Sequence, residues 1–171
     1  DLNLLKDGFE ACWITDFPMF EETSDGSLTS LHQPFTCPVE TELEKLGKLS
    51  PLEINSKAYD MVINGVEIGG GSIRIHKKAL QEKVFELLGL SEDEAQKKFG
   101  FFLKVLGTGC APHGGIALGL DRIAMILTGA ETIRDVIAFP KTQSAMCLLT
   151  EAPGEVPDES LEELNIKKIE E

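Results

Sequence analysis

The spacing of apolar residues changes several times along the chain, and each spacing predicts a different element. Ala11–Phe20 is rich in aromatic and apolar residues, which predicts a strand that ends at Pro18. The polar run at 21–30 predicts a loop. A short extended piece follows at 31–35, and a short helix is the alternative to a loop at 41–48. This first part of the chain is therefore expected to hold one strand among loops.

The stretch Ala58–His76, with the sequence AYDMVINGVEIGGGSIRIH, predicts a β-hairpin. Residues 58–63 form its first strand, and the Asn64-Gly65 pair that follows favours a type I′ turn, in which both residues need positive φ. The return strand starts directly after the turn. We expect Gly69–Gly71 to interrupt it before it resumes, because glycines weaken a strand and mark a bulge or a close backbone approach.

The second half of the chain is dominated by helical spacing. Apolar residues recur every three or four positions in Lys78–Leu88, which predicts a helix. Ser91 and Glu94 form a capping box, so a second helix is expected from there to about Leu106. Further on, the sequence predicts a buried strand at 116–118, a helix at 120–127 that Gly129 ends, and a strand at 136–139. Together these elements predict an α+β fold, an antiparallel β-sheet flanked by helices on one face.

Composition excludes several classes of protein. With 171 residues, 42% of them hydrophobic, the chain has the size of about one domain and enough apolar residues for a core. The formal net charge of −13 makes it a poor non-specific binder of nucleic acid, since phosphate contacts need clustered Lys and Arg. The four cysteines form no CxxC pair, which argues against a zinc site or a disulfide framework. Because no apolar run is long enough to span a membrane and no signal peptide is visible, we expect a cytoplasmic protein with no membrane segment.

Two carboxylates are expected to share one face of the predicted hairpin. A two-residue turn pairs Ile63 with Val66 and sets Val62 opposite Glu67. Asp60 points to the same side as Val62, because side chains alternate along a strand. Asp60 and Glu67 are then diagonal neighbours, and two such carboxylates can bracket a Mg²⁺ ion bound to phosphates. The alternative is a pair of solvated acids on an exposed face.

The glycine run decides on which face Arg74 lies. By strict alternation Arg74 faces away from Glu67. One bulge within Gly69–Gly71 would reverse the register and bring both side chains to one face, where Arg74 can bind a carboxylate with two parallel hydrogen bonds. The alternative is a wide bend with Arg74 as a surface charge. No Gly-Lys-Ser/Thr follows the glycines, so this is not a Walker loop.

A third candidate site lies where a glycine-punctuated strand runs into a helix, in GGIALGLDR. Arg122 falls in the first turn of that helix, whose free N–H groups and dipole attract phosphate. An arginine at this end is explained by a bound anion or, alternatively, by an ion pair with Asp121 or another acid. The histidines have no metal-ligand partner at useful spacing and are by default structural or surface residues: His32, His76 and His113.

A family resemblance connects these features. GIALGLDRIAMIL resembles motif 3 of class II aminoacyl-tRNA synthetases. Seven strings follow one another in the order found in bacterial aspartyl-tRNA synthetases: FPMFE, HQPFT, AYDMVINGVEIGGGSIRIH, KFGFFL, GGIALGLDR, IRDVIAFPK and LLTEAP. The resemblance covers about residues 9–153. It implies an antiparallel sheet flanked by helices and an enzyme that activates L-aspartate with ATP and transfers it to tRNA(Asp).

The resemblance also implies roles on the nucleotide side of the site. Arg122 matches the motif 3 arginine that binds the ATP phosphates, and it is implied to be catalytic together with Glu67. Gly119, Leu120 and Asp121 match the positions that line the nucleotide.

On the amino-acid side, Glu67 is similar to the carboxylate that holds ATP and Mg²⁺, with Asp60 as its companion on the metal. Arg74 is similar to the residue that holds the carboxylate of the substrate aspartate. His32 is similar to the histidine that contacts the bound aspartate, and Ser72 falls where the family lines the same pocket.

The chain also departs from the family pattern. The family reads His-His-Pro-Phe where this chain has Gln33 after the first histidine, which leaves any role of the second histidine open. Motif 1, which forms the homodimer interface, motif 2, the anticodon-binding domain and the bacterial insertion have no counterpart here. We therefore expect residues 1–153 to be the C-terminal part of a catalytic domain, 154–171 to be an acidic C-terminal tail, and the isolated chain to be inactive.

Two other functions remain as alternatives. One is an asparagine synthetase built like a tRNA synthetase, which makes the same aspartyl-adenylate. The other is a non-catalytic binding module derived from a synthetase. The joint presence of Asp60, Glu67, Arg74 and Arg122 argues against the module, since a chain freed from catalysis need not keep all of them.

Overall fold

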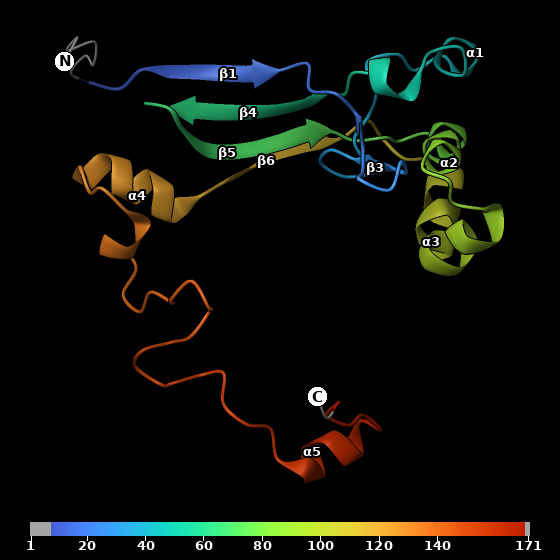
Figure 1. Cartoon of the computed structure of the whole chain (residues 1–171). Helices are drawn as coiled ribbons and strands as arrows, with labels where there is room; N and C mark the ends of the chain where they lie inside the picture. The colour runs from blue at the N-terminus through green and yellow to red at the C-terminus, as the bar shows by residue number, and fades with distance from the viewer. Residues whose placement is uncertain (1–7, 170–171) are drawn as a thin grey trace. The chain divides into compact units, whose positions relative to one another are not determined.

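The computed structural model describes residues 8–169. The chain divides into two compact units, Asp1–Ile123 and Ala124–Glu171, and each is described by itself. The main sheet belongs to the first unit and has four antiparallel strands in the order β1-β4-β5-β6 (Figure 1). Their bounds are Ala11–Thr15 for β1, Ala58–Ile63 for β4, Val66–Ile73 for β5 and Gly114–Leu118 for β6.

The hairpin β4–β5 forms as predicted, with one correction. Asn64 and Gly65 both have positive φ, 50° and 77°, as a type I′ turn requires. Val62 faces Glu67 across the hairpin, but the next pair is Met61 with Gly69, so Ile68 is the bulged residue. The bulge was predicted within the glycine run, and its observed position directly before that run shows the prediction to be wrong by one residue.

The glycines Gly69–Gly71 do not interrupt β5, which continues through them. They are explained instead by the close approach of β6. A Cβ atom on Gly69 would lie 2.5 Å from the carbonyl oxygen of Ala117 on β6. A Cβ atom on Gly71 would collide with the carbonyl oxygen of Gly115. The run therefore lets β5 and β6 approach closely, as the alternative reason for strand glycines predicts.

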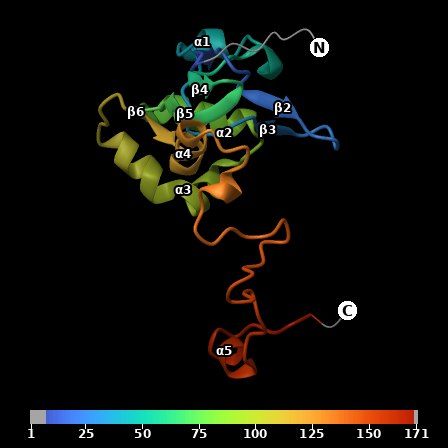
Figure 2. The ribbon, with the colours of Figure 1, turned by 90° about the vertical axis from the view of Figure 1, so that its left-hand side faces the viewer.

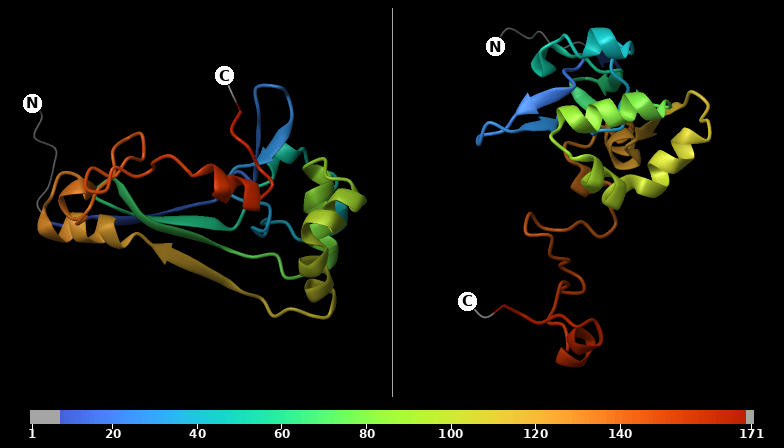
Figure 3. Two further views of the ribbon diagram at one scale, coloured as in Figure 1. Left: turned by 90° about the horizontal axis from the view of Figure 1, so that it is seen from below. Right: turned by 90° about the vertical axis from the view of Figure 1, so that its right-hand side faces the viewer.

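The helices of the first unit lie at the end of the sheet where β4 begins and β5 ends (Figure 1). They are α1 Leu43–Leu46, the 3₁₀ turn η1 Pro51–Glu53, α2 Lys78–Leu87 and α3 Glu92–Gly107. The capping box is confirmed: the Ser91 hydroxyl accepts from the Glu94 N–H at 3.3 Å, and the Glu94 carboxylate accepts from the Ser91 N–H at 3.0 Å. Figure 3 shows α2 and α3 across the end of the strands.

The hydrophobic core lies at this helical end. One buried cluster joins residues of the N-terminal segments to the residues that follow β5 and to α2. Its members are Met19, Phe20, Cys37, Leu46, Ile54, Ile75, Leu80 and Val84. A second cluster joins α2 to α3: Phe85, Ala95 and Leu103. Large apolar side chains are nevertheless exposed on the strands of the main sheet: Trp13, Ile14, Ile73, Ile116 and Leu118. Ile116–Leu118 was predicted to be a buried strand. The strand forms, but its burial is wrong, because α1, α2 and α3 lie at the end of the sheet and leave the side chains of β6 exposed.

The segment predicted as a polar loop at 21–30 is a second hairpin instead. Strand β2, Phe20–Glu22, pairs with β3, Leu28–Ser30, and its turn projects away from the helices (Figure 2). Asp25 closes the turn, because its carboxylate accepts from the Ser27 N–H at 3.1 Å. The expected strand at Ala11–Phe20 is correspondingly shorter and ends at Thr15.

Helix α4, Leu120–Thr128, runs from the first unit into the second and ends at Gly129, whose φ is 68°. The strand predicted at 136–139 is wrong: within the described second unit these residues are turn and bend, preceded by the 3₁₀ turn η2 Ile133–Asp135. Helix α5, Asp158–Glu163, lies in the acidic tail. The compact units divide inside α4, whereas the boundary expected at 153 from the resemblance stays a prediction. Along residues 8–169, none of the helices is long and apolar enough to cross a membrane.

Candidate active site

A hollow of about 360 Å³ opens over β4 and β5. Five of the residues singled out from the sequence line it: His32, Asp60, Glu67, Ser72 and Arg74. His32 comes from the loop after β3, and the other residues come from the hairpin β4–β5 and the residue directly after it. The predicted aspartate-side and metal-side residues therefore share one cavity.

The bulge at Ile68 explains why Glu67 and Arg74 share it. Seven positions separate them, so strict alternation would put them on opposite faces of β5. One extra residue between them reverses the alternation. The predicted consequence of a bulge is confirmed, although its predicted position is not.

Asp60 lies across the backbone of its cross-strand partner Gly70. A Cβ atom built on Gly70 would collide with the Asp60 carboxylate oxygen Oδ1. Gly70 therefore leaves the space that the carboxylate occupies, and any larger residue there would force Asp60 to move.

Arg122 is joined to the rim of the hollow through Glu67. Its Nη1 donates to the Glu67 carbonyl oxygen at 2.6 Å and lies 3.6 Å from the carboxylate oxygen Oε2. The junction of β6 and α4, which positions Arg122, is attached to the bulged residue of β5: the Gly119 N–H donates to the Ile68 carbonyl oxygen at 2.7 Å. The sequence left an ion pair of Arg122 with Asp121 or with another acid as an alternative to a bound anion. In the structure the ion-pair partner of Arg122 is Glu67.

The ion pair of Arg122 and Glu67 is open to solvent, since the two side chains are 45% and 51% exposed. An exposed pair of this kind contributes little to stability, roughly 0–1 kcal/mol. Both partners are therefore free to exchange each other for a ligand at small energetic loss. Gly119, Leu120 and Asp121 lie at the start of the same helix, outside the set of residues that line the hollow.

His32 sits on the loop that follows β3. Its ring packs edge-to-face on Phe17, with the centroids 4.7 Å apart. The His32 side chain is exposed and lines the hollow together with the partly buried Gln33, the residue at which the chain departs from the family pattern.

Sequence reasoning missed Thr36, which forms part of the floor. Thr36 is 2% exposed, and its hydroxyl donates to the equally buried Ser72 Oγ at 3.3 Å. Its backbone also forms a β-bridge with Arg74. The available signal was its position in the string HQPFT, next to residues that the resemblance had already marked.

The donor groups in the hollow fit a cation only together with a substrate. Among residues 8–169, no group of three or more His, Cys, Asp or Glu side chains is arranged to hold a metal ion. Asp60 and Glu67 supply carboxylate oxygens from two strands. Such a pair suits Mg²⁺, which prefers a few carboxylates completed by phosphate oxygens and water.

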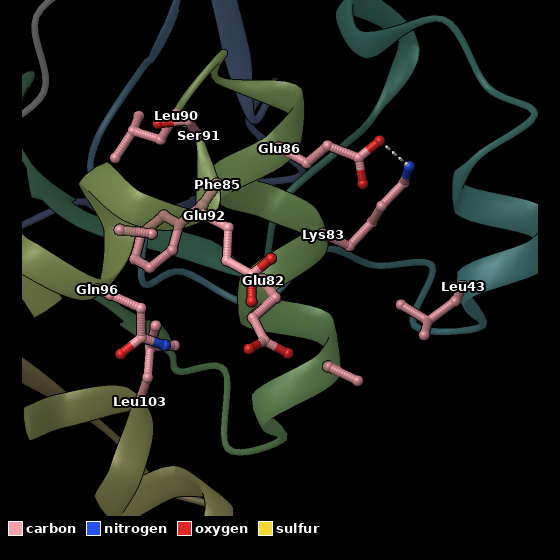
Figure 4. A pocket seen from close by; sticks show the side chains of 12 residues that line it. Leu43, Glu82, Lys83, Phe85, Glu86, Leu90, Ser91, Glu92, Gln96 and Leu103 are labelled. Atoms are coloured by element: carbon pink, nitrogen blue, oxygen red, sulfur yellow. Dashed lines mark hydrogen bonds and ion pairs between the residues drawn. The ribbon is translucent and has the colours of Figure 1, made fainter. Parts of the chain in front are cut away.

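A second hollow, of about 580 Å³, lies between α1, α2 and α3 (Figure 4). Its floor is apolar, with Phe85 and Leu103, and Glu82 and Glu92 stand on its rim. Within the described part of the chain, none of the residues predicted for the site lines it. It is therefore separate from the cavity on the sheet.

Comparison with known proteins agrees with this arrangement. Residues 1–143 match the family described as tRNA synthetases class II (D, K and N), and the chain belongs to this family. It is 59% identical over 162 residues to an aspartate–tRNA(Asp/Asn) ligase of Sulfurovum sp. (strain NBC37-1). That match covers 95% of this chain and 27% of the ligase, so the chain spans about a quarter of the length of this curated relative.

Solved structures confirm the fold. An aspartyl tRNA synthetase from Entamoeba histolytica superposes with a TM-score of 0.56 at 24% identity, over 78% of this chain and 23% of that one. An asparaginyl-tRNA synthetase from the same organism, solved with asparaginyl-adenylate, gives 0.56 at 24% identity, over 79% of this chain and 26% of that one. The predicted α+β fold with an antiparallel sheet and flanking helices is thereby confirmed.

Proposed function

We propose that the chain is part of an aspartate–tRNA ligase, which activates L-aspartate with ATP to aspartyl-adenylate and then transfers it to tRNA(Asp). The observation that carries this proposal is the hollow on β4 and β5. It gathers Asp60, Glu67 and Arg74, and Glu67 in turn holds Arg122. The identity to an aspartate–tRNA(Asp/Asn) ligase supports the choice of amino acid.

Arg74 is the proposed binding group for the substrate's side-chain carboxylate. A guanidinium presents parallel N–H groups that match a carboxylate, and an Arg–carboxylate pair in a cavity is stronger than one in open solvent. Its backbone is fixed from two sides, because Thr36 bridges it and its N–H donates to the His113 carbonyl oxygen at 2.9 Å. His32 and Ser72 complete this side of the proposed aspartate site.

Glu67 and Arg122 are the proposed ATP-binding groups, with Gly119–Asp121 along the nucleotide at the start of α4. We place motif 3 at this junction of β6 and α4. Mg²⁺, held by Asp60 and Glu67 with phosphate oxygens, would supply positive charge to neutralise the triphosphate. Arg122 adds positive charge beside the same phosphates.

Activation needs no protein nucleophile. An oxygen of the substrate's α-carboxylate forms a bond to the α-phosphorus of ATP, and the bond from that phosphorus to the bridging oxygen breaks to release pyrophosphate. The residues act by holding the two reactants in line and by stabilising charge on the phosphoryl oxygens. Arg74 and Arg122, at opposite ends of the β5 face, suit this division of labour.

The remaining partners belong to the whole protein. For a full-length ligase we propose transfer to tRNA(Asp), homodimer formation through motif 1 and a cytoplasmic location. The chain spans about a quarter of the length of the Sulfurovum ligase. The acidity of the chain supports the view that most tRNA contacts come from other segments.

The test is amino-acid-dependent ATP–pyrophosphate exchange by the full-length protein that carries this chain, with aspartate, asparagine and lysine compared. We expect exchange with aspartate and at most about 1% of that rate with asparagine or lysine, because the side chains of these two amino acids offer no carboxylate to Arg74. Exchange driven by asparagine or lysine at a comparable rate would refute the proposed substrate.

The isolated 171 residues should give little or no exchange. The reason is that only one of the two arginines that clamp ATP in this family is expected in this chain. Exchange by the isolated chain at the level of the full-length protein would show that no essential part is missing.

A further inference from the structure

Gln81, in the middle of α2, is a polar residue with no solvent exposure: 0% of its surface is accessible. Its amide Nε2 donates to the carbonyl oxygen of Pro34 at 2.8 Å. This orientation of the amide is the only consistent one, because a carbonyl oxygen can accept but not donate. In the described structure the other amide atom, Oε1, is buried without a hydrogen-bond partner.

An unpaired buried carbonyl is unfavourable, so the fold gains nothing from a glutamine here as such. A methionine or leucine would fill the same space among apolar neighbours on α2 such as Leu80 and Val84. What the amide provides, and an apolar residue cannot, is the single hydrogen bond to Pro34. The role of Gln81 must therefore be sought in the segment that Pro34 belongs to.

That segment carries His32 and Gln33 over the mouth of the hollow. On its upstream side the Leu31 N–H donates to the Met19 carbonyl oxygen at 3.1 Å. On its downstream side the first tie to the helices is the bond from Gln81 to Pro34. These two anchors, on the N-terminal segment and on α2, flank the two residues that reach the site. Within the segment, the His32 ring also packs on Phe17, and the Gln33 carbonyl oxygen accepts a long hydrogen bond from the Thr36 N–H at 3.4 Å.

Beyond Pro34 the chain is held independently of Gln81. The Phe35 carbonyl oxygen accepts from the Ile75 N–H at 2.9 Å, and the Phe35 ring meets the Phe99 ring edge-to-face at 5.5 Å. The Cys37 N–H donates to the Ile73 carbonyl oxygen at 2.8 Å. Loss of the Gln81 amide should therefore loosen the stretch up to Pro34 and leave the rest in place.

We infer that Gln81 is a positioning residue, which fixes the His32–Gln33 segment against the bound amino acid through its hydrogen bond to Pro34. This inference rests on the proposed function, because it takes the hollow to be the aspartate site. Gln81 does not touch the substrate in this account. It acts through the loop, so it should affect the binding of aspartate and leave the binding of ATP alone.

The experiment is steady-state pyrophosphate exchange by the full-length protein with Gln81→Met, which keeps volume and burial and removes the donor. One neutral hydrogen bond corresponds to about fivefold in an equilibrium. We expect the KM for aspartate to rise about fivefold, with the KM for ATP and kcat changed less than about twofold. Amide hydrogen exchange should also accelerate in the peptide that covers residues 31–34.

Val84→Ala is the matched control. Val84 lies one turn further along α2 and is 0% exposed, and its truncation leaves a cavity in a core cluster that contains none of residues 31–34. It should lower thermal stability at least as much as Gln81→Met and leave the KM for aspartate unchanged. A rise in that KM equal to the one in Gln81→Met would show a general effect of a weakened core and overturn the inference.

An aspartate KM in Gln81→Met within about twofold of the unmodified protein, or unchanged amide exchange at 31–34, would also overturn it. Absence of aspartate-dependent exchange in the unmodified protein has a different meaning. That result refutes the proposed function, and the amide-exchange comparison then still decides whether Gln81 holds the loop.

Discussion

The helical end of the first unit and its sheet differ in how deeply their apolar side chains are buried. At the helical end, Val84 and Phe85 are 0% and 1% exposed and belong to two packed clusters. On the sheet, Trp13 and Leu118 are 57% and 54% exposed. The helical end therefore supplies most of the stability of this unit, since burial of apolar area is the main favourable term in folding.

The candidate site spans both ends. Ser72 and Thr36, at its floor, are buried beside the helical core, and they support Arg74. Glu67, near the start of β5, and Arg122, in the first turn of α4, lie at the open end of the sheet, and both side chains are about half exposed. The proposed aspartate side is thus held by the core of this chain, whereas the proposed ATP side is held mainly by one bulge. The difference predicts that substitutions in the exposed ion pair at the open end change activity with little loss of stability, whereas truncations in the buried clusters at the helical end chiefly lower stability.

The largest expected effect is that of Arg122→Ala. In the full-length protein it should lower aspartate-dependent pyrophosphate exchange by about a thousandfold, because it removes positive charge from the phosphoryl group. Its effect on the free energy of unfolding should stay under about 1 kcal/mol, as expected for an exposed ion pair. Lys104→Ala, an equal loss of charge at an exposed position of α3, is the control and should leave exchange unchanged. Similar exchange rates in the two variants would contradict the assignment.

The converse effect is that of Phe85→Ala at the helical end. Truncation of this fully buried ring should lower the free energy of unfolding by about 3–5 kcal/mol, measured by urea denaturation. Phe101→Ala removes the same ring from α3 at a position that is 84% exposed, and it should cost less than about 0.5 kcal/mol. Equal losses would mean that the helical end is not the stable core of the unit.

A smaller effect is expected where the two ends meet. Gly70→Ala places a methyl group against the Asp60 carboxylate, so Asp60 must move and exchange should fall about tenfold. Gly115→Ala, on the neighbouring strand, adds the same methyl group where no atom lies within 4 Å. It should change exchange less than about twofold, and a comparable fall in both variants would disconnect Asp60 from the reaction.

The smallest expected effect concerns the start of α3. Ser91→Ala removes the capping hydroxyl and should lower the free energy of unfolding by about 1 kcal/mol. The pKa of Glu94 is lowered, mainly because the Ser91 hydroxyl and then the Ser91 N–H donate to its carboxylate. A carboxyl group with a lowered folded pKa stabilises the fold above its ordinary value of 4.5, and this contribution disappears as the pH falls through the folded value.

Glu94→Gln separates these two parts of the cap. It keeps a side-chain acceptor for the Ser91 N–H and removes the titration. Stability measured by urea denaturation between pH 6 and pH 3 should therefore fall less steeply in this variant than in the unmodified protein. Identical slopes would exclude a contribution from Glu94.

Sequence alone predicted the elements whose signals are local. The hairpin β4–β5 follows from Asn64-Gly65, and the start of α3 follows from Ser91 and its capping box. The small hairpin β2–β3 escaped because its strands have three residues each, and polar side chains on an exposed hairpin resemble those of a loop.

The non-local features could be predicted only in part. That Glu67 and Arg74 share a cavity depends on one extra residue, and a glycine run does not reveal whether its glycines form the bulge or the close approach beside it. The pairing of Arg122 with Glu67, 55 residues apart, requires the register of β5 with β6. The sequence did not single out Gln81, because glutamine is common on the exposed face of a helix and only the structure shows that this one is buried.

The central claim is that the hollow on β4 and β5 binds aspartate and ATP together. A crystal structure of the full-length protein with a non-hydrolysable aspartyl-adenylate analogue tests it most directly. We predict the aspartyl carboxylate against the Arg74 guanidinium and the phosphate mimic within hydrogen-bond distance of Arg122, which then leaves Glu67. An analogue bound elsewhere, for example between α1, α2 and α3, with Arg122 still paired to Glu67, would contradict the account.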